Sequence, residues 1–239
     1  MVRYEIIQKE GLKMIKATLN GETVKAEAVD LHYMQGNVTL EAKTSGSGIG
    51  GMFKAAIGGE SIFRQQYSGT GEVFFGPPMF GEYNVLELNN EEWILDKGSY
   101  VCSDATIELG VIRNSLWTSA WGGEGMFQTT VSGSGTVIYQ SDGPVQEINL
   151  ENDTLSVDGS FAVARQSSLE FTVEKASKGW FGSATTGEGF LNVMRGSGTV
   201  MLAPVPNRDV NLISHMNGAV SYTHLRAHET LRYLVCRLL

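Results

Sequence analysis

Short segments in which apolar and polar residues alternate run along most of the chain, and they come in pairs around Gly-rich motifs. In the middle of the sequence, an apolar-rich segment at 126–131 precedes the motif that contains Gly133 and Gly135, and a second one follows at 136–139. β-Branched and aromatic residues dominate both segments, which is typical of strands. Glycines tolerate the positive φ angles of a tight reversal. The pattern therefore predicts a β-hairpin whose turn lies at the two glycines.

The same pattern occurs three times along the chain. Each copy begins with a Gly-Glu pair and has a Gly-x-Gly motif at its predicted turn. The copies contain Gly59, Glu60, Gly69 and Gly71, then Gly123, Glu124, Gly133 and Gly135, then Gly187, Glu188, Gly196 and Gly198. The three glutamates are evenly spaced, and self-similarity at a fixed period indicates a repeated structural unit. Because a single hairpin is at best marginally stable in water, we expect the three copies to share a core.

Further strand-like segments precede each copy. Arg3–Ile7 and Lys13–Ala17 predict a first hairpin, and a second recurring element begins at Gly21, Gly98 and Gly159. Apolar and polar residues alternate in these segments, so each strand is expected to have one buried and one wetter face. The sequence therefore predicts a single all-β domain at 1–205. It divides into three units at about 1–79, 80–143 and 144–205.

Large aromatic residues also recur ahead of each glutamate. Phe53, Trp117 and Phe181 are evenly spaced, and Trp121 and Trp180 lie close to them in the sequence. One interpretation is that each aromatic side chain packs in the core of its own unit. The other is a candidate apolar interface on one face, because large exposed apolar patches usually mark interaction sites. Trp suits the membrane–water boundary, but an acidic chain is repelled by anionic lipid, so we expect this face to favour self-association.

The three recurring glutamates also have two interpretations. Each precedes a predicted strand in a Gly-flanked turn, where its carboxylate can accept hydrogen bonds from nearby backbone N–H groups. This structural role is the one that we expect. The alternative is that Glu60, Glu124 and Glu188 converge to hold a cation. Three anions close together are costly without a counter-charge, so we predict no metal site.

The composition narrows the classes of partner and compartment. The 239 residues carry a formal net charge of −8, and the sequence pI is about 5.1. A nucleic-acid partner is disfavoured, because nucleic-acid affinity comes largely from basic side chains that neutralise phosphates. Cys102 and Cys236 are too few for a disulfide framework, which indicates a reducing compartment. The sequence starts with no signal peptide and has no spanning segment of ~20 apolar residues, so we expect a cytoplasmic protein, with peripheral membrane contact as an open alternative.

We find no sequence motif that indicates catalysis, metal binding or cofactor binding. The four histidines form no cluster with metal-ligand spacing, and no Gly-x-Ser-x-Gly or His-Glu-x-x-His pattern occurs. Gly46, Gly48 and Gly51 match a dinucleotide fingerprint only formally, because the strand–helix context of a true fingerprint is missing. We therefore predict no catalytic residue and no cofactor, name no small-molecule ligand, and expect that the chain is not an enzyme.

Several of the segments above resemble the altered inheritance of mitochondria protein 24 family. The resemblance rests on Arg3–Ile7, Gly59–Phe63, Glu92–Tyr100 and Gly123–Phe127, and it covers about 1–205. It implies a fold like that of the tryptophan RNA-binding attenuation protein (TRAP), with β-sandwich-like or barrel-like units of the double-stranded β-helix type triplicated around a pseudo-threefold axis. It also implies prokaryotic relatives of uncertain role and a eukaryotic relative associated with the mitochondrial inner membrane. The family has no established catalytic residues to carry over, and a shared fold does not transmit function.

Two classes of function follow from these observations. The expected class is a non-enzymatic β-scaffold or oligomerising protein, with membrane association left open. The alternative is a small-ligand or RNA-binding module like the fold relative. An RNA-binding protein shows a basic stripe, whereas Arg64, Arg113, Arg165 and Arg195 are scattered singly.

The C-terminal part of the chain differs from the repeats. A short extension at 206–220 is followed by a helix-like tail at 221–239. The tail is basic, with Arg226, Arg232 and Arg237 against Glu229. It looks like translated sequencing-adapter sequence, and the alternative is a basic amphipathic helix that lies on a membrane.

Deletion of 221–239 is predicted to leave the melting temperature unchanged, because the repeats of 1–205 are expected to supply the core by themselves. Thermal unfolding of the full-length and shortened chains, followed by circular dichroism, measures this directly. A clear fall in melting temperature on deletion would show instead that the tail packs on the β domain.

Overall fold

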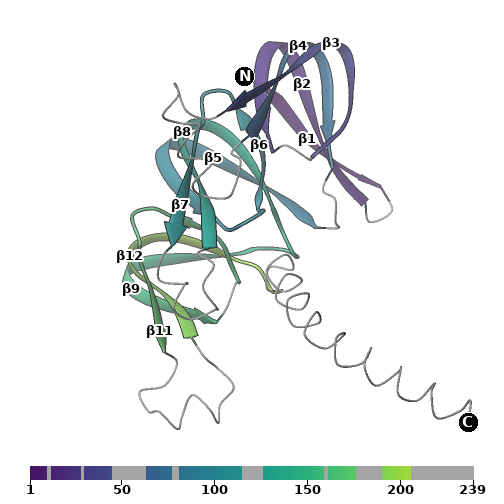
Figure 1. The fold of residues 1–239 in the computed structure, drawn as a ribbon. Helices are drawn as coiled ribbons and strands as arrows, with labels where there is room; N and C mark the ends of the chain where they lie inside the picture. The colour runs from purple at the N-terminus through teal and green to yellow at the C-terminus, as the bar shows by residue number, and fades with distance from the viewer. Residues whose placement is uncertain are drawn as a thin grey trace, which may run out of the picture.

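The computed structural model of the chain describes residues 1–9, 12–27, 30–44, 63–76, 81–114, 126–158, 161–175 and 190–205 (Figure 1). The described residues form β-strands and turns and contain no helix. One large sheet runs through them, and the strand pairs described here are antiparallel. The predicted all-β class is therefore confirmed.

The strands fall into three sets in chain order, which we call units 1, 2 and 3. Unit 1 consists of β1 (Arg3–Lys9), β2 (Leu12–Ala26), β3 (Leu31–Thr44) and β4 (Phe63–Phe75). Unit 2 consists of β5 (Glu82–Leu95), β6 (Tyr100–Asp104), β7 (Glu108–Asn114) and β8 (Met126–Ser141). Unit 3 consists of β9 (Gln146–Asp158), β10 (Ala162–Gln166), β11 (Glu170–Lys175) and β12 (Phe190–Leu202).

One strand in each unit lies between the others. β4 pairs with β2 on one side and with β3 on the other. β8 pairs with β5 and with the two shorter strands β6 and β7, and β12 pairs likewise with β9, β10 and β11. We call β4, β8 and β12 the central strands, β2, β5 and β9 the leading strands, and β3, β6–β7 and β10–β11 the flanking strands.

The registers of the leading and central strands match between the units. The second glycine of each Gly-x-Gly motif faces a leucine of the leading strand. The facing pairs are Leu19 with Gly71, Leu88 with Gly135, and Leu150 with Gly198. Two residues after the leucine, each leading strand has a residue with positive φ. These residues are Gly21 (92°), Asn90 (57°) and Asn152 (52°).

The flanking strands also share one irregularity. In each unit the register to the central strand shifts across a single residue, which is His32, Val101 or Val163. The residues just after the shift are Tyr33, Cys102 and Ala164, which face Phe74, Ile138 and Met201. These two sets of registers define which residues are equivalent between units.

The predicted hairpins at the Gly-x-Gly motifs are wrong. Gly69 and Gly71 lie inside the single strand β4, and the other two motifs lie inside β8 and β12 in the same way. All six glycines do have positive φ, yet the chain continues in the same strand. The reason is that the neighbouring strands pair with the central strand on both sides of the motif. The positive φ angles accompany a ladder irregularity and make no turn.

The other predictions for the strands are mixed. The first hairpin is confirmed, because β1 and β2 are antiparallel with Ile6 opposite Ile15. The predicted equivalence of the segments that begin at Gly21 and Gly98 is wrong. The register makes Gly21 the counterpart of Asn90 and Asn152, whereas Gly98 lies in the turn that follows β5.

Strand pairing also joins each unit to the next. The end of β2 pairs with β6, with Ala26 opposite Cys102, and the end of β5 pairs with β10, with Leu95 opposite Ala164. In both joints, the outer edge of a leading strand is covered by the flanking strand of the next unit. The sheet order is β11-β12-β10-β5-β8-β6-β2-β4-β3, with β1, β7 and β9 attached beside β2, β8 and β12.

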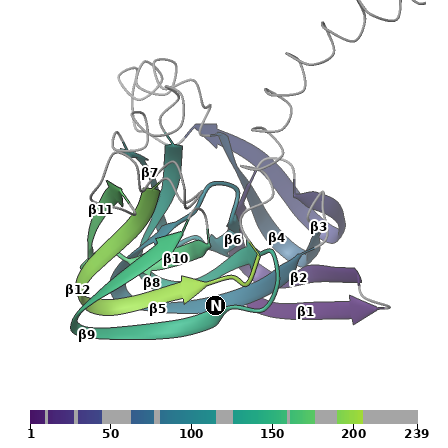
Figure 2. The same cartoon turned by 90° about the horizontal axis from the view of Figure 1, so that it is seen from below.

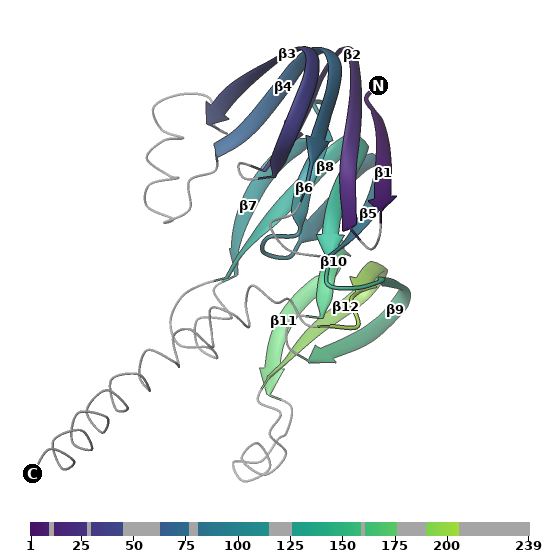
Figure 3. The same ribbon diagram turned by 90° about the vertical axis from the view of Figure 1, so that its right-hand side faces the viewer.

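The three units lie in sequence across the molecule. In Figure 1 and Figure 3, β3 and β4 lie at the top and β9, β11 and β12 at the bottom, with the strands of unit 2 between them. Figure 2 separates β3 from β9 as well, on opposite sides of the view. The first and last units are therefore at opposite ends of the described structure.

The close approach of central and flanking strands predicts the cost of adding a side chain at Gly69. A Cβ at Gly69, where φ is +135°, would lie 2.2 Å from the carbonyl oxygen of Asn37. Gly69→Ala is therefore expected to lower the free energy of unfolding by about 3 kcal/mol. Gly21→Ala is the control, because Gly21 also has positive φ but has open space around its Cβ position, so its loss is expected to be about 1 kcal/mol. Urea unfolding measures both losses, and equal values would show that the backbone conformation alone sets the cost.

Candidate functional site

Several predicted site residues lie outside the described residues. They are Phe53, Trp117, Trp121, Trp180, Phe181, Gly59, Glu60, Gly123, Glu124, Gly187 and Glu188. The apolar interface and the role of the three glutamates therefore stay predictions, and the segment 206–239 is outside the described residues as well. The described part of the repeat motif consists of Gly69, Gly71, Gly133, Gly135, Gly196 and Gly198.

The serine between the two glycines binds the leading strand. The Ser134 Oγ accepts a hydrogen bond of 2.9 Å from the backbone N–H of Asn90. In unit 3, the Ser197 Oγ accepts the equivalent bond, also 2.9 Å, from the N–H of Asn152. Each serine therefore satisfies the N–H group of a positive-φ residue that the irregular ladder leaves without a regular partner.

A side chain of the flanking strand binds the other side of the motif. The Asp104 Oδ2 accepts a hydrogen bond of 3.0 Å from the N–H of Thr136, directly after the second glycine. The Gln166 Oε1 accepts the equivalent bond, 2.8 Å long, from the N–H of Thr199. A Cβ on Gly135 would lie 3.0 Å from this Asp104 oxygen and would crowd it. The glycine, the serine and the flanking acceptor therefore form one structural node that links three strands.

Asp104 also belongs to a buried polar group at the joint between units 1 and 2. Its Oδ1 accepts a hydrogen bond of 3.2 Å from the hydroxyl of Tyr4, and the hydroxyls of Tyr100 and Ser103 lie 3.0 Å apart. Burial, with the nearby carboxylates, raises the pKa of Tyr4 and that of the Cys102 thiol. Because the thiolate is the nucleophilic form, Cys102 is an inert buried thiol at neutral pH.

The joint between units 2 and 3 buries a positive charge. Arg165 is 5% exposed, its guanidinium lies 4.4 Å from the ring centroid of Phe171, and it donates a hydrogen bond of 3.3 Å to Gln128 Oε1. Burial lowers the pKa of Arg165 to about 10, and the charge of Asp96 opposes this shift. The guanidinium therefore stays protonated at neutral pH and serves the packing of the joint.

The two joints are also apolar cores. The first core packs Ile15, Val24, Ala26 and Phe75 of unit 1 with Tyr83, Val101, Cys102 and Ile138 of unit 2. The second packs Trp93, Leu95 and Tyr139 of unit 2 with Val163 and Ala164 of unit 3. The described residues of the third core all belong to unit 3.

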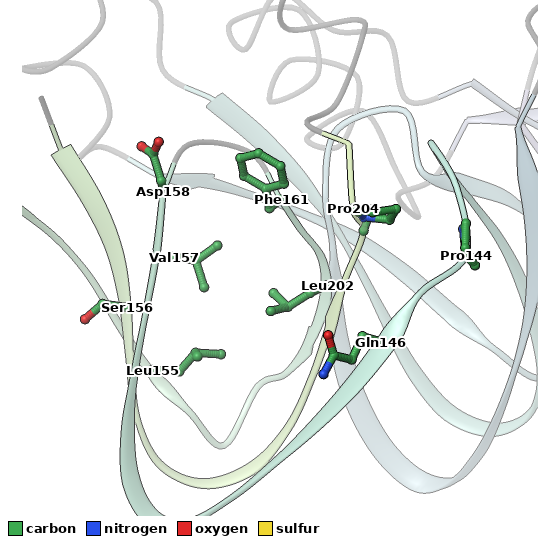
Figure 4. Close-up of a pocket in the computed structure, with 10 residues that line it drawn as sticks. Pro144, Gln146, Leu155, Ser156, Val157, Asp158, Phe161, Leu202 and Pro204 are labelled. Carbon is green, nitrogen blue, oxygen red and sulfur yellow. The ribbon is translucent and has the colours of Figure 1, made fainter. Parts of the chain in front are cut away.

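Unit 3 has an open groove beside its leading strand, with a volume of about 500 Å³. Figure 4 shows Leu155, Val157, Phe161 and Leu202 around the groove, with Ser156 directed away from them. Gln146 and Pro204 lie on its opposite side (Figure 4). The described lining residues are mostly apolar and include no cluster of ionisable groups, so the groove suits an apolar occupant better than a polar substrate.

Metal and membrane features are also absent from the described part of the chain. No group of three or more His, Cys, Asp or Glu side chains within it is placed to hold a metal ion. None of its segments is a helix long and apolar enough to cross a membrane.

The architecture defines the class of this protein as an all-β protein in which one antiparallel sheet carries three sets of strands with matching registers. Residues 4–205 match the family described as Mitochondrial biogenesis AIM24, and the chain belongs to that family. The predicted family membership is therefore confirmed.

The chain is also similar to proteins of Streptococcus pyogenes. It is 27% identical over 211 residues to an uncharacterised protein of serotype M6, which covers 84% of this chain and 85% of that protein. The crystal structure of a Streptococcus pyogenes protein matches with a TM-score of 0.71 at 25% identity, over 93% of this chain and 100% of that one. These relatives support the fold and assign no activity.

Sequence reasoning missed the flanking-strand acceptors and the groove. Asp104 and Gln166 each lie two residues after the equivalent positions Cys102 and Ala164, and a hydroxyl residue follows two positions later as Thr106 or Ser168. Both hydroxyls donate to the carbonyl oxygen of the serine between the glycines. Alignment of these polar residues across the units was the signal that could have found the node.

Removal of the Asp104 carboxylate is predicted to destabilise the fold. Asp104→Ala leaves the buried N–H of Thr136 without its acceptor, so we expect a loss of about 2 kcal/mol in the free energy of unfolding. Asp104→Asn keeps an oxygen acceptor, as Gln166 does in unit 3, and is expected to lose less than half as much. Urea unfolding of both variants tests this, and an equally large loss in Asp104→Asn would assign the effect to the negative charge.

Proposed function

We propose that this protein is a non-enzymatic β-scaffold that associates with copies of itself. The observation that carries the proposal is the way in which the units are joined. Each internal joint pairs the edge of a leading strand with the edge of a flanking strand, and the described sheet leaves one edge of each kind open, on β9 and on β3. A chain built by edge pairing and ending in open edges is suited to further assembly.

The use of the polar side chains supports a scaffold over an enzyme. Asp104, Gln166, Ser134 and Ser197 are hydrogen-bonded to backbone groups of neighbouring strands. Cys102 and Arg165 are enclosed in the joints. These side chains stabilise the repeat, and none of them faces the groove of unit 3.

The three units are, in this proposal, copies of one TRAP-like unit with pseudo-threefold symmetry. The matching positions of Leu19, Leu88 and Leu150 opposite the glycines support this relation, as do the matching irregularities in the flanking strands. A repeat of this kind presents the same type of edge at every unit.

The charge of the chain disfavours the other candidate partners. The formal net charge of −8 opposes both anionic lipid and nucleic acid. Of the predicted scattered arginines, Arg165 is buried and Arg195 pairs with Glu174 at 2.6 Å. We therefore place peripheral membrane contact second and RNA binding third, in a cytoplasmic protein without a cofactor.

A small apolar ligand is the second candidate function, and the groove of unit 3 is the observation that favours it. Its volume of about 500 Å³ lies in the range of small-molecule sites. Saturable binding of an apolar fluorescent probe at one site per chain, in a protein that stays monomeric, would favour this candidate over assembly.

The proposal predicts that the chain forms species heavier than its 26.0 kDa monomer in a concentration-dependent way. Size-exclusion chromatography with light scattering measures the mass, and flotation with neutral and anionic liposomes measures membrane contact. We expect oligomers and no binding to anionic liposomes, and a monomer at all concentrations would overturn the proposal. The double variant Trp117→Ser, Phe181→Ser tests the predicted apolar interface, because oligomers that persist in it associate through another surface.

A further inference from the structure

The outer edges of the three leading strands differ in whether a further strand pairs with them. The C-terminal half of β2 is covered by β6, and that of β5 is covered by β10. The equivalent half of β9, at 155–158, pairs with β12 on its inner side and with no described strand on its outer side. The same structural position is therefore closed twice and open once.

The groove of unit 3 is the counterpart of the two closed cores. By register, Gln146, Leu155, Val157 and Leu202 are the equivalents of Ile15, Val24, Ala26 and Phe75. All four line the groove, whereas their equivalents in unit 1 lie in a core with residues of unit 2. Val24 is 0% exposed, while Leu155 is only partly buried. The groove therefore corresponds to a joint in which the flanking strand of a further unit is missing.

The surface that would fill such a groove is exposed at the other end of the described chain. In the two closed joints, the flanking strands place Cys102 and Ala164, which are 0% and 2% exposed, in the joint cores. The next residues, Ser103 and Arg165, are buried on the opposite face of the strand, at 0% and 5% exposed. Their equivalents in unit 1 are Tyr33 and Met34, which are 46% and 42% exposed. Two large apolar side chains are therefore exposed to solvent at positions whose equivalents in units 2 and 3 are buried.

We propose that β3 of one copy pairs antiparallel with the outer edge of β9 in a second copy, so that Tyr33 covers the groove of unit 3 and Met34 lies on the opposite face of the sheet, beside Ser156. This inference rests on the proposed self-association and names its surface. The two edges cannot meet within the described part of one chain, because β3 and β9 lie at opposite ends of it in all three views (Figures 1–3). A second copy supplies the missing strand in the register that the chain already uses twice.

The register of this third joint follows from the first two. The N–H of Glu27 donates to the carbonyl of Val101, and that of Asp96 donates to the carbonyl of Val163, both at 2.9 Å. The equivalents are the N–H of Asp158 and the carbonyl of His32. Ser156 then lies opposite Met34, as Lys25 lies opposite Ser103 and Ile94 opposite Arg165.

This contact is heterologous, since it joins two different surfaces of the chain. A heterologous contact repeats from copy to copy and yields a closed ring or an open filament. An isologous dimer through either edge alone is a different arrangement, and the experiment below separates the two.

The test uses two proline variants at facing positions. The N–H groups of Ser156 and Met34 point to the outer edges, because residues two positions away from a hydrogen-bonded pair point to the same side. Ser156→Pro and Met34→Pro therefore remove one edge donor each and leave the ladders inside units 3 and 1 intact, as proline is tolerated on edge strands. Ser156→Ala and Met34→Leu keep the N–H groups and serve as matched controls.

Light scattering on each variant and on their equimolar mixture gives the result. We expect each proline variant alone to be monomeric, and the mixture to form a species of twice the chain mass, because each variant retains the edge that the other lacks. The controls are expected to form the oligomers of the parent. Dimers of one proline variant alone, or oligomers that persist in both, would overturn the β3–β9 contact and leave self-association standing. A parent chain that is monomeric throughout would overturn both.

Hydrogen exchange on the parent protein keeps the inference testable if a proline variant does not fold. Amides at 31–35 and 155–158 are expected to exchange at least tenfold more slowly at high protein concentration than at low concentration. The outer edge of β5 near Val85, which is 51% exposed, is the internal control and is expected not to change. Oligomers without protection of the two segments would show that association runs through another surface.

Discussion

The constraint on which the rest of the structure depends is the close approach of two backbones at the Gly-x-Gly motif. A Cβ at Gly71 would lie 2.2 Å from the carbonyl oxygen of Gln35, which is far inside contact distance, so the central strand can pass the flanking strand only without side chains. In unit 2, the equivalent glycine, Gly135, has no side chain either, and the space at this position lets the Asp104 carboxylate of the flanking strand reach the N–H of Thr136. The serine of the motif, Ser134, faces the other way and satisfies the leading strand. Three strands are therefore held together by a few residues, and this repeated contact sets the register from which the joints follow.

Much of this arrangement can be predicted from the sequence, and the limit has a physical cause. Alternation of apolar and polar residues predicts the strands, the all-β class and the first hairpin, and the spacing of the glycines predicts the positions of the three Gly-x-Gly motifs that lie in β4, β8 and β12. The sequence does not show whether a glycine with positive φ reverses the chain or lets it pass a neighbour, because both conformations satisfy the same local preference. Only pairing with β2 and β3 on both sides of Gly69 decides this.

The equivalence of Gly21 with Asn90 and Asn152 was hidden for a related reason. Asparagine tolerates the left-handed conformation better than most residues. The same positive-φ backbone conformation is therefore adopted by a glycine in unit 1 and by asparagines in units 2 and 3. An alignment that matched glycine to glycine paired Gly21 with Gly98 instead. The flanking acceptors were missed similarly, because Asp104 and Gln166 perform one role with different side chains. The predicted aromatic face and the recurring glutamates lie outside the described residues, so the candidate site here comes from the joints.

The polar residues on the outer edge of β9 are compatible with a covered edge. Exposed edge strands are commonly protected by charged side chains, and Ser156 and Asp158 could be interpreted in this way. The closed joints argue otherwise, because their edges carry Lys25 and Glu27 in unit 1 and Asp96 in unit 2. Side chains at these positions alternate out of the sheet plane while the backbone pairs in it. A polar residue therefore does not mark an edge that stays open, and the apolar exposure of Tyr33 and Met34 is the feature that needs a partner.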